Sequence, residues 1–585
     1  MKTLLSMLTE LVGNTFTSCG YNHTYGQVTL SNRPDLCQFQ CNGALAAAKT
    51  YKKSPMLIAK EVVEHLQDQS YFETIQYIAP GFINITLQDD YLVSYLNTVA
   101  LSSQFGCTPI ENQETVIIDY GGANIAKPLH IGHLRTAIIG ESLKRMYRFL
   151  GYNVLGDVHL GDWGLQIGLI IAEVKKRHPE LPYFDASYKE DYPNEAPFTI
   201  SELEEIYPVA SSYAKEHPEF MSEAKNITFL FQQNHPGYKA LWQQILKVSI
   251  DDLKKNYTAL NVHFDLWKKE SDAQPYIPKM IENLKELGLA YENDGAVVVD
   301  IKEDTDTREM PPCILVKSDG ATLYSTTDLA TLIERKQLFN PNEVIYIVDK
   351  RQSLHFEQVF RTARKAELIP PTTKLTFLGF GTMNGTDGKP FKTRSGGVMR
   401  LEQLIEEVHT KVYAKVAQNK AISKEEALII SKQIGLAALK YGDLSNQISK
   451  DYVFDLERFT SFEGNTGPYL LYTAVRMSAL LEKASLVDIQ SKIDAPSSEM
   501  ERALMLKLAL FNELVPESIM QYSPHKLCQY LYELCNLFNR FYHEHKILTE
   551  SNISKQQSWL KLTTLCKEML VTGLDLLGIE VPHKM

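Results

Sequence analysis

The segment ETVIIDYGGANIAKPLHIGHLR, residues 114–135, contains the pattern from which the architecture can be read. Its β-branched run at 114–120 predicts a short strand, and glycines follow at positions 121 and 122. A helical pattern then continues from about residue 132 to residue 150. A strand, a glycine-bearing loop and a helix in this order are typical of the start of a nucleotide-binding α/β domain.

The same segment carries His130 and His133 at the start of the expected helix. A helix amino terminus offers unpaired backbone N–H groups and a positive dipole end, which suit a triphosphate. Residues three apart lie on one helix face, so both imidazoles can donate hydrogen bonds to phosphate oxygens. Gly132 has no Cβ, which would let an adenine ring lie against the backbone. The plain structural alternative is that the two histidines only cap a helix.

Outward from this segment, the chain divides into three expected domains. Residues 1–110 mix helical and strand patterns, and residues 111–435 form the α/β domain. An insertion rich in charge, tyrosine and proline interrupts the α/β domain at about residues 175–315. Residues 436–585 show helical periodicity with few turn signals, so we expect a separate all-helical domain there.

Several shorter patterns fill in these domains. Ser54 and Pro55 start a predicted helix, and residues 81–87 alternate as a strand does. Strand patterns return after the insertion, as expected for the second half of the parallel sheet; they occupy residues 313–316, 344–348 and 375–380.

The composition is that of a globular chain, with 44% hydrophobic and 22% charged residues. No apolar run approaches the roughly 20 residues that a membrane span needs, so we expect no membrane partner. Glu10 interrupts the apolar stretch after Lys2, which favours an amphipathic helix over a signal peptide. Eight sparse cysteines without a CxxC pair favour reduced thiols in a cytoplasmic protein over a zinc site or disulfides, and no protein metal site is predicted. The net charge of −11 argues against nucleic-acid binding as the whole function, but it allows one basic face.

The longer string NIAKPLHIGHLR, residues 124–135, resembles the arginyl form of the class I aminoacyl-tRNA synthetase signature. GDWGLQIG, residues 161–168, resembles a second block of that family, although it can also be only a turn beneath a site. The resemblance implies an α/β fold, in which a Rossmann-type parallel-sheet catalytic domain is joined by an N-terminal α+β tRNA-binding domain and a C-terminal helical anticodon-binding domain. It also implies that the chain, with ATP and Mg²⁺, converts arginine to an adenylate and transfers it to tRNA(Arg), with tRNA needed for activation.

The second class I signature matches GKPFKTRSG, residues 388–396, with Lys389, Lys392 and Arg394 as the expected ATP contacts. This string departs from the general KMSKS pattern, since one lysine position holds Phe391 and another holds Arg394. In similar arginyl enzymes the lysine before the histidine motif, here Lys127, is thought to supply the missing charge to the phosphates. A solvated basic turn is the structural alternative.

A guanidinium requires planar acceptors, and a carboxylate matches both its charge and its fork geometry. Tyr324 and Asp328 lie four residues apart and share a face if a helix starts there. The family resemblance assigns this pair to the substrate side chain, although a Tyr–Asp pair alone is more often structural. It also implies further arginine contacts at Asn124, His133, Gln352, Asp119 and Glu270. The family usually has a Ser/Ala-Pro pair where this chain has Gly122 and Ala123.

For tRNA, Tyr469, Tyr472 and Arg476 occupy one helical stripe, on which unpaired anticodon bases can stack. Arg540 is an expected phosphate contact, and packing within the domain is the alternative for each of the four. The strings QFQCNG, residues 38–43, and PGFIN, residues 80–84, resemble the family's N-terminal domain, which grips the tRNA elbow.

Two alternatives to arginine ligation stay open at this point. One is a class I ligase for glutamate, glutamine or cysteine, and the other is a non-catalytic tRNA-binding paralogue. The Tyr324–Asp328 pair disfavours acidic substrates, and the intact histidines disfavour the paralogue. We expect the chain to act as a monomer.

Overall fold

The computed structural model describes residues 1–585 apart from 68, 390–398, 420 and 485–491. The chain falls into two compact units, of which the larger contains residues 111–460 and 577–579. The other unit contains residues 1–110, 461–576 and 580–585. The expected limit between residues 435 and 436 lies inside helix α15, Lys424–Leu444, and the domain limits stay a prediction. Within the described residues, every helix is too short or too polar to span a membrane.

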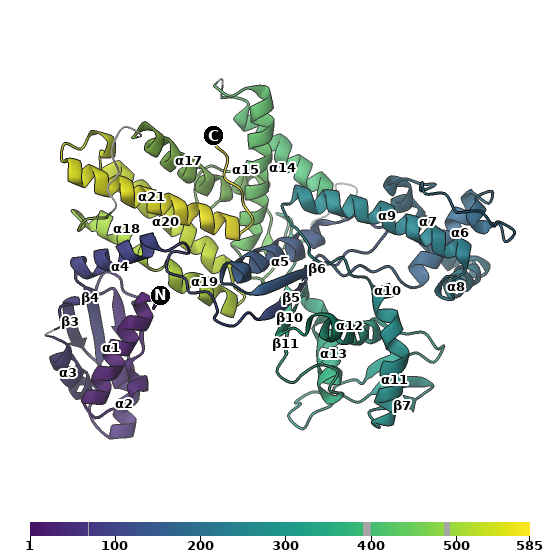
Figure 1. Cartoon of the computed structure of the whole chain (residues 1–585), viewed down its shortest axis with the longest axis horizontal. Helices are drawn as coiled ribbons and strands as arrows, with labels where there is room; N and C mark the ends of the chain where they lie inside the picture. The colour runs from purple at the N-terminus through teal and green to yellow at the C-terminus, as the bar shows by residue number, and fades with distance from the viewer. Residues whose placement is uncertain (68, 390–398, 420, 485–491) are drawn as a thin grey trace. The chain divides into compact units, whose positions relative to one another are not determined.

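The larger unit is built on a four-stranded parallel sheet in the order β11-β10-β5-β6. Its strands are β5 Thr115–Asp119, β6 Asn153–Asp157, β10 Glu343–Asp349 and β11 Lys374–Phe380. Helix α5, Ile131–Phe149, lies on one face of the sheet, and helices α12, Tyr324–Phe339, and α13, Ser353–Lys365, lie on the other (Figure 1). Buried Ile117 and Tyr346 of the sheet pack with the two latter helices in one hydrophobic core. The predicted Rossmann-type fold is confirmed.

The insertion is mostly helical, and it ends in a small antiparallel sheet. Its helices are α6 Leu165–Arg177, α7 Ile200–Glu216, α8 Pro218–Gln232, α9 Pro236–Ala259, α10 Glu270–Ala273 and α11 Ile277–Glu286. The sheet consists of β7 Ala290–Asn293, β8 Ala296–Val299 and β9 Cys313–Val316. The prediction that residues 313–316 return to the parallel sheet is therefore wrong. Cys313 is buried and Ile314 is exposed, which is the alternation of a half-buried antiparallel strand rather than of a strand covered on both faces.

The end of the larger unit returns to the start of α5. The elements there are β12 Met383–Asn384, α14 Leu401–Val416, α15, β13 Tyr452–Val453 and α16 Leu456–Phe459. Arg135 of α5 is 1% exposed, and its Nε–H donates to Asp443 of α15 at 2.9 Å. The same guanidinium donates to the carbonyl of Gly381, just after β11, at 2.6 Å. Because a buried charge requires such partners, Arg135 fixes α5 against the segments that follow the sheet.

The smaller unit combines an α+β part with a helical part. A four-stranded antiparallel sheet has the order β1-β2-β4-β3 and consists of β1 Val28–Leu30, β2 Phe39–Cys41, β3 Phe72–Ile78 and β4 Phe82–Leu87. Its helices are α1 Leu4–Ser18, α2 Gly43–Tyr51, α3 Pro55–Leu66 and α4 Asp89–Leu101. The predicted amphipathic first helix, the helix after Ser54 and the strand within residues 81–87 are all confirmed.

The helical part of this unit packs on α4. Its helices are α17 Gly467–Lys483, α18 Glu499–Ala509, α19 Phe511–Met520, α20 Pro524–Glu544 and α21 Ile553–Leu576. Arg502 of α18 donates to Asp89 at 2.5 Å and to the carbonyl of Leu87 at 2.6 Å. Asn512 of α19 donates to the hydroxyl of Tyr95 at 2.9 Å. All eight cysteines are free thiols, and seven of them are buried.

Candidate active site

The two histidines form a reciprocal cap on α5. His130 Nδ1 accepts a hydrogen bond from the Gly132 N–H at 3.0 Å, and His133 Nδ1 accepts one from the His130 N–H, also at 3.0 Å. An imidazole nitrogen that accepts carries no proton, so each neutral ring has its proton on Nε2. The ring centroids lie 4.0 Å apart. Capping therefore fixes both tautomers and leaves the Nε2–H groups as the hydrogen-bond donors of the pair.

Because of this cap, the backbone N–H groups at the helix terminus are not free to bind a phosphate. The sequence predicted unpaired backbone N–H groups, but those of Ile131, Gly132 and His133 all have acceptors within the chain. The prediction is wrong because the Met399 carbonyl, the His130 side chain and the His130 carbonyl accept these three hydrogen bonds. The donors that stay at this terminus are the imidazoles. A Cβ on residue 132 would lie 2.7 Å from His130 Cε1, so the glycine also makes room for the ring.

Both rings are neutral at physiological pH. Burial lowers the pKa of His133 to about 3, and the charge of His130 acts in the same direction. Burial also lowers the pKa of His130, together with the charge of Lys127. Neutral imidazoles act as hydrogen-bond donors without charge repulsion between them. Any positive charge near the phosphates must therefore come from Lys127 or from another segment.

Asn124 and Glu270 converge on Gly161. The segment after β5 pairs with the segment after β6, since Gly161 donates to the Ala123 carbonyl and Ile125 donates to the Gly161 carbonyl, both at 3.1 Å. A Cβ on Gly161 would lie 2.1 Å from Asn124 Oδ1 and 3.7 Å from Glu270 Oε1. The GDWG block is thus a turn that makes room for these two side chains.

Glu270 is a partly buried acid beside other acids. Its backbone N–H donates to the Leu160 carbonyl at 3.0 Å, which places it at the end of the extension of β6. Burial, together with the charges of Asp162 and Asp328 and against that of His159, raises the pKa of Glu270 to about 7. A cation bound beside Glu270 would favour its ionised form.

Tyr324 and Asp328 lie in the first turns of α12, so the predicted shared helix face is confirmed. Tyr324 is 71% exposed. Asp328 Oδ2 is 2.6 Å from His355 Nε2 of α13, a residue that sequence analysis did not single out. Since Oδ2 already has one partner, Asp328 has a fixed orientation, and Oδ1 and a second lone pair on Oδ2 stay available to a ligand.

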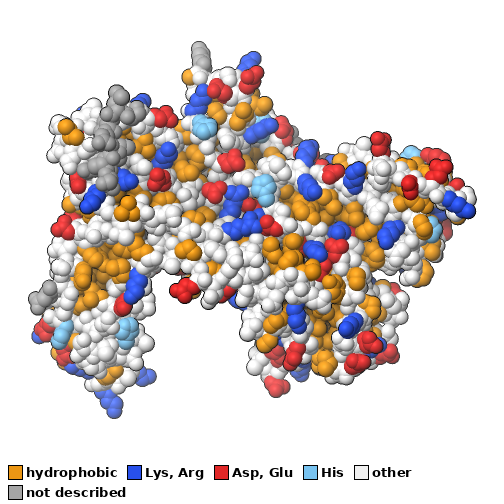
Figure 2. Space-filling view, viewed as in Figure 1, with side chains coloured by type: hydrophobic (Ala, Val, Ile, Leu, Met, Phe, Trp, Pro, Cys, Tyr) orange, Lys and Arg blue, Asp and Glu red, His pale blue; other side chains and the backbone are white. Residues whose placement is uncertain are grey.

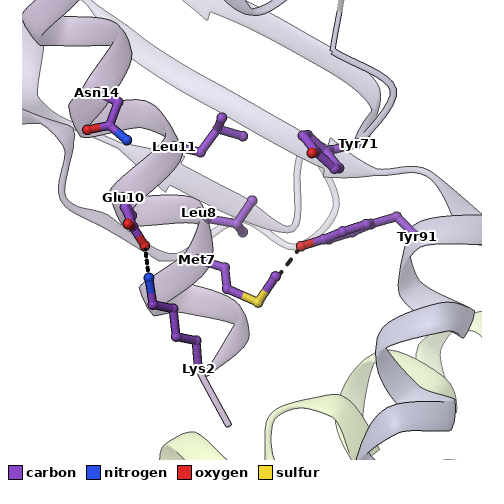
Figure 3. Close-up of a pocket in the computed structure, with 8 residues that line it drawn as sticks. All are labelled: Lys2, Met7, Leu8, Glu10, Leu11, Asn14, Tyr71 and Tyr91. Atoms are coloured by element: carbon purple, nitrogen blue, oxygen red, sulfur yellow. Dashed lines mark hydrogen bonds and ion pairs between the residues drawn. The ribbon is translucent and has the colours of Figure 1, made fainter.

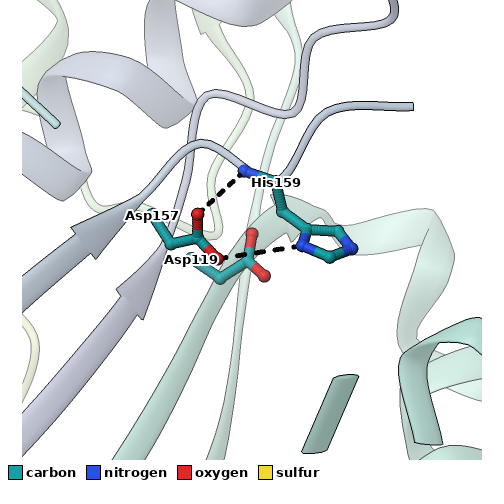
Figure 4. Close-up of side chains that lie close together, drawn as sticks. All are labelled: Asp119, Asp157 and His159. Carbon is teal, nitrogen blue, oxygen red and sulfur yellow. Dashed lines mark hydrogen bonds and ion pairs between the residues drawn. The ribbon is translucent and has the colours of Figure 1, made fainter. Parts of the chain in front are cut away.

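The carboxyl ends of β5 and β6 carry a compact charge cluster, in which Asp119, Asp157 and His159 face one another (Figure 4). Arg335 of α12 donates to Asp119 at 2.5 Å and to Asp157 at 2.8 Å. His159 Nδ1 lies 3.7 Å from Asp157. Burial opposes the charge of His159, but the nearby carboxylates of Asp157 and Asp119 raise its pKa to about 9. Two internal cations therefore balance two carboxylates.

Three of these cluster residues were absent from the sequence prediction. Asp157, His159 and Arg335 lie in ordinary strand and helix contexts, and Arg335 comes 216 residues after its partner Asp119. His159 has a φ of 32°, which a non-glycine residue adopts only where its surroundings require it. No local pattern indicates such a cluster before the sheet order is known.

The remaining predicted substrate contacts are more exposed. Gln352 is exposed at the end of a short turn that begins α13. Lys389 is exposed, its backbone N–H donates to Asp387 at 3.1 Å, and its carbonyl accepts from Gly385 at 2.8 Å. Lys392 and Arg394 lie outside the described residues.

In the helical part of the smaller unit, Tyr469, Tyr472 and Arg476 share one face of α17. The Tyr469 hydroxyl donates to Asn536 at 2.8 Å, so this ring also packs α17 against α20. The Arg476 guanidinium lies 4.8 Å from the centroid of the 42%-exposed Tyr472 ring. Arg540 is exposed on α20. Figure 2 shows basic and acidic side chains interspersed over the visible surface of each unit. The distribution of charge on this face therefore does not by itself identify which basic residues bind phosphates.

The α+β part of this unit contains a pocket of about 470 Å³, lined by residues of α1, by Tyr71 just before β3 and by Tyr91 of α4 (Figure 3). The rings of Tyr71 and Tyr91 line it, with centroids 5.0 Å apart. Asn14 adds an amide, and Lys2 adds an ammonium group whose charge is balanced by Glu10, also in the lining, at 2.5 Å. Aromatic faces with amide and ammonium groups suit a planar polar ring such as a nucleobase.

Comparison with known proteins agrees with this geometry. Residues 97–456 match the family model "tRNA synthetases class I (R), catalytic domain", residues 470–585 match "DALR anticodon binding domain" and residues 5–87 match "Arginyl tRNA synthetase N terminal domain". The arginine–tRNA ligase of Alkaliphilus oremlandii is 54% identical over 100% of both chains. That of Francisella tularensis subsp. novicida is 43% identical over 99% of both. The crystal structure of arginyl-tRNA synthetase from Plasmodium falciparum covers 100% of both chains with a TM-score of 0.84 and 26% identity.

Proposed function

Because the chain belongs to the family of class I arginyl-tRNA synthetases, we propose that it activates arginine with ATP and transfers the arginyl group to the terminal adenosine of tRNA(Arg). One observation supports this most directly. A capped pair of neutral imidazoles and a set of carboxylates lie in the loops after the carboxyl ends of one parallel sheet, where α/β folds bind nucleotides.

In the first step, the arginine carboxylate attacks the α-phosphorus of ATP, and the bond to the bridging oxygen of pyrophosphate breaks. The Nε2–H groups of His130 and His133 donate to phosphate oxygens, and Lys127 compensates their growing charge. Gly132 has no Cβ, which leaves room for the His130 ring at this terminus. Lys389, with Lys392 and Arg394, adds positive charge from the second signature. In the second step, the 2′-hydroxyl of the terminal adenosine attacks the carbonyl carbon, and AMP leaves.

The substrate side chain enters the acidic half of the site. Asp328 accepts the guanidinium with its free lone pairs, Glu270 ionises to form a second contact, and Tyr324 adds a hydroxyl. Gln352 contacts the backbone groups of the amino acid, and Asn124 and His133 make further contacts with arginine. Arg335 already donates a hydrogen bond to Asp119. Asp119 therefore acts on the guanidinium through its negative charge rather than through a hydrogen bond. Lysine lacks the planar fork and would leave acceptors unpaired.

Mg²⁺ accompanies ATP in this proposal, but the described residues do not form a ligand set for it. Near the histidines they offer imidazoles and an ammonium group, whereas Mg²⁺ prefers oxygen ligands. The carboxylates of Asp119 and Asp157 already bind Arg335. Phosphate oxygens are then the ligands of the ion, and no step depends on a protein ligand.

For tRNA, the anticodon contacts Tyr472, Arg476 and Arg540. Tyr469 holds α17 against α20 through its hydrogen bond to Asn536 and so fixes the position of these side chains. The pocket of Tyr71 and Tyr91 offers a place for an unpaired base of the tRNA elbow. Bound tRNA is required for the first step. The enzyme acts as a monomer in the cytoplasm, in keeping with its eight free thiols.

Pyrophosphate exchange into ATP, measured with each proteinogenic amino acid with and without tRNA(Arg), tests the proposal. Exchange is expected only with arginine and only with tRNA present. Exchange driven by another amino acid would contradict the specificity, and no exchange under any condition would favour a tRNA-binding paralogue.

A further inference from the structure

Helix α7 of the insertion lies against the histidine motif through one face. The Lys127 ammonium group is 4.4 Å from the centroid of the Tyr207 ring. Three residues earlier on the same helix, Glu204 forms an ion pair with Arg400 at 2.7 Å, and the Glu204 side chain is only 8% exposed. Residues three apart on a helix point to the same side, so both contacts belong to one face of α7.

Arg400 belongs to the segment that pairs with the motif. Arg400 and His130 form an antiparallel bridge. Leu401 donates to the Leu129 carbonyl at 2.8 Å, and Ile131 donates to the Met399 carbonyl at 3.2 Å. Through Glu204, α7 is therefore anchored to the strand-like segment beside the histidines, and through Tyr207 it contacts the lysine just before them.

Within the described part of the chain, the Lys127 ammonium group contacts an aromatic ring and not a carboxylate. Among the residues that the structure describes, no carboxylate forms an ion pair with Lys127. An aromatic ring attracts an ammonium group with its negative face but carries no net charge. A carboxylate would neutralise the lysine and compete with phosphate oxygens for it. A ring can hold the lysine in place and leave its full charge to a phosphate.

We infer that Tyr207 is a positioning residue, which holds the Lys127 ammonium group beside the histidine pair without neutralising it, with Glu204 anchoring the same helix face on Arg400. The inference rests on the proposed role of Lys127 in pyrophosphate displacement. It assigns to the insertion, whose sequence resembles the family least, a part in binding the nucleotide.

Tyrosine 213 provides a matched control. It lies on the same helix, and the Lys176 ammonium group is 3.5 Å from its ring centroid, so it makes the same kind of contact away from the motif. The variants Tyr207→Leu, Tyr207→Phe and Tyr213→Leu are compared in pyrophosphate exchange at saturating tRNA(Arg). Lys127→Met and the double variant Lys127→Met/Tyr207→Leu complete a thermodynamic cycle.

Tyr207→Leu is expected to lower kcat of exchange about fivefold, with KM for arginine unchanged, as for the loss of a partly buried cation–π contact. Tyr207→Phe keeps the ring and is expected to restore the rate. Tyr213→Leu is expected to keep the rate of the natural chain. In the Lys127→Met background, Tyr207→Leu should have no further effect, because its partner is gone.

The outcomes distinguish the proposed role of Lys127 from the inferred role of Tyr207. If Lys127→Met leaves exchange unchanged, the proposed role of Lys127 fails, and the inference fails with it. If Lys127→Met impairs exchange but Tyr207→Leu matches Tyr213→Leu, only the inference is overturned. It is also overturned if the Tyr207→Leu defect is as large without Lys127 as with it, or if Tyr207→Phe does not restore the rate.

Discussion

The three carboxylates Asp119, Asp328 and Glu270 differ in the hydrogen-bond partners that the protein already gives them. Asp119 has Arg335 as a partner, and Asp328 has His355. Glu270 has a buried environment instead, which raises its pKa to about 7. The first two are therefore held in place before a ligand arrives, whereas the third can change its charge when a cation binds.

Arginine binding is expected to release protons through Glu270. Near pH 7 this acid is about half protonated, and a guanidinium favours its ionised form, so binding lowers its pKa. Arginine affinity should therefore rise as the pH increases through about 7. Titration calorimetry in buffers of different ionisation enthalpy measures the released protons. Glu270→Gln should abolish the release, and an unchanged release in this variant would contradict the assignment.

Asp328 is expected to dominate arginine affinity. Asp328→Asn keeps the size of the side chain but removes the charge, so the fork of the guanidinium loses its ionic acceptor. We expect kcat/KM for arginine to fall by a factor that corresponds to a loss of about 2–5 kcal/mol in binding free energy, with KM for ATP unchanged. Asp304→Asn makes the same change at an exposed position and serves as the control. A loss of less than about tenfold would mean that Asp328 does not face the guanidinium.

At the scale of elements, the site depends on two segments that lie closer together than side chains usually allow. Gly161 permits this approach, because a Cβ there would lie 2.1 Å from Asn124 Oδ1. We expect Gly161→Ala to displace Asn124 and to lower kcat/KM for arginine about a hundredfold. Steady-state kinetics and thermal unfolding distinguish a local shift from unfolding.

Gly435→Ala is the matched control for this change. Gly435 lies within α15. A Cβ added to it would lie 3.4 Å from its nearest neighbour, a Val408 side-chain carbon, which is an ordinary contact distance. Alanine favours the helix there, so activity should be retained. If Gly161→Ala proves as harmless as Gly435→Ala, Asn124 does not need its present position.

At the scale of the molecule, the smaller unit joins segments that are far apart in the sequence. Arg502 connects its two parts, with its side chain 14% exposed and bonded to Asp89 and to Leu87. Removing it leaves a half-buried carboxylate without its cation, which costs about 1–3 kcal/mol.

Arg502→Met is therefore expected to loosen α4 from the helical part. Hydrogen exchange measured by mass spectrometry should increase in residues 89–101, with no change in the peptide that contains the histidine motif. The exposed Arg540→Met is the control and should not change exchange in α4. Equal exchange in both variants would show that Arg502 does not hold the two parts together.

Local patterns were sufficient for much of this molecule. The strand predicted within residues 114–120, the glycine loop and the helix at the histidines all formed, because each is determined by residues within a few positions of one another. The pairing of Tyr324 with Asp328 followed in the same way from helical spacing. The predicted return of residues 313–316 to the parallel sheet failed, because a short apolar run does not specify its pairing partner.

The sequence by itself thus determined the architecture and the residue types of the site. Only the tertiary structure decided which of those groups have partners. Arg335 reaches Asp119 across 216 residues, His355 reaches Asp328 from another helix, and Tyr207 meets Lys127 from the insertion. Charge pairing and burial act over distances of a few ångströms in space, whatever the separation along the chain, so no local pattern could indicate them.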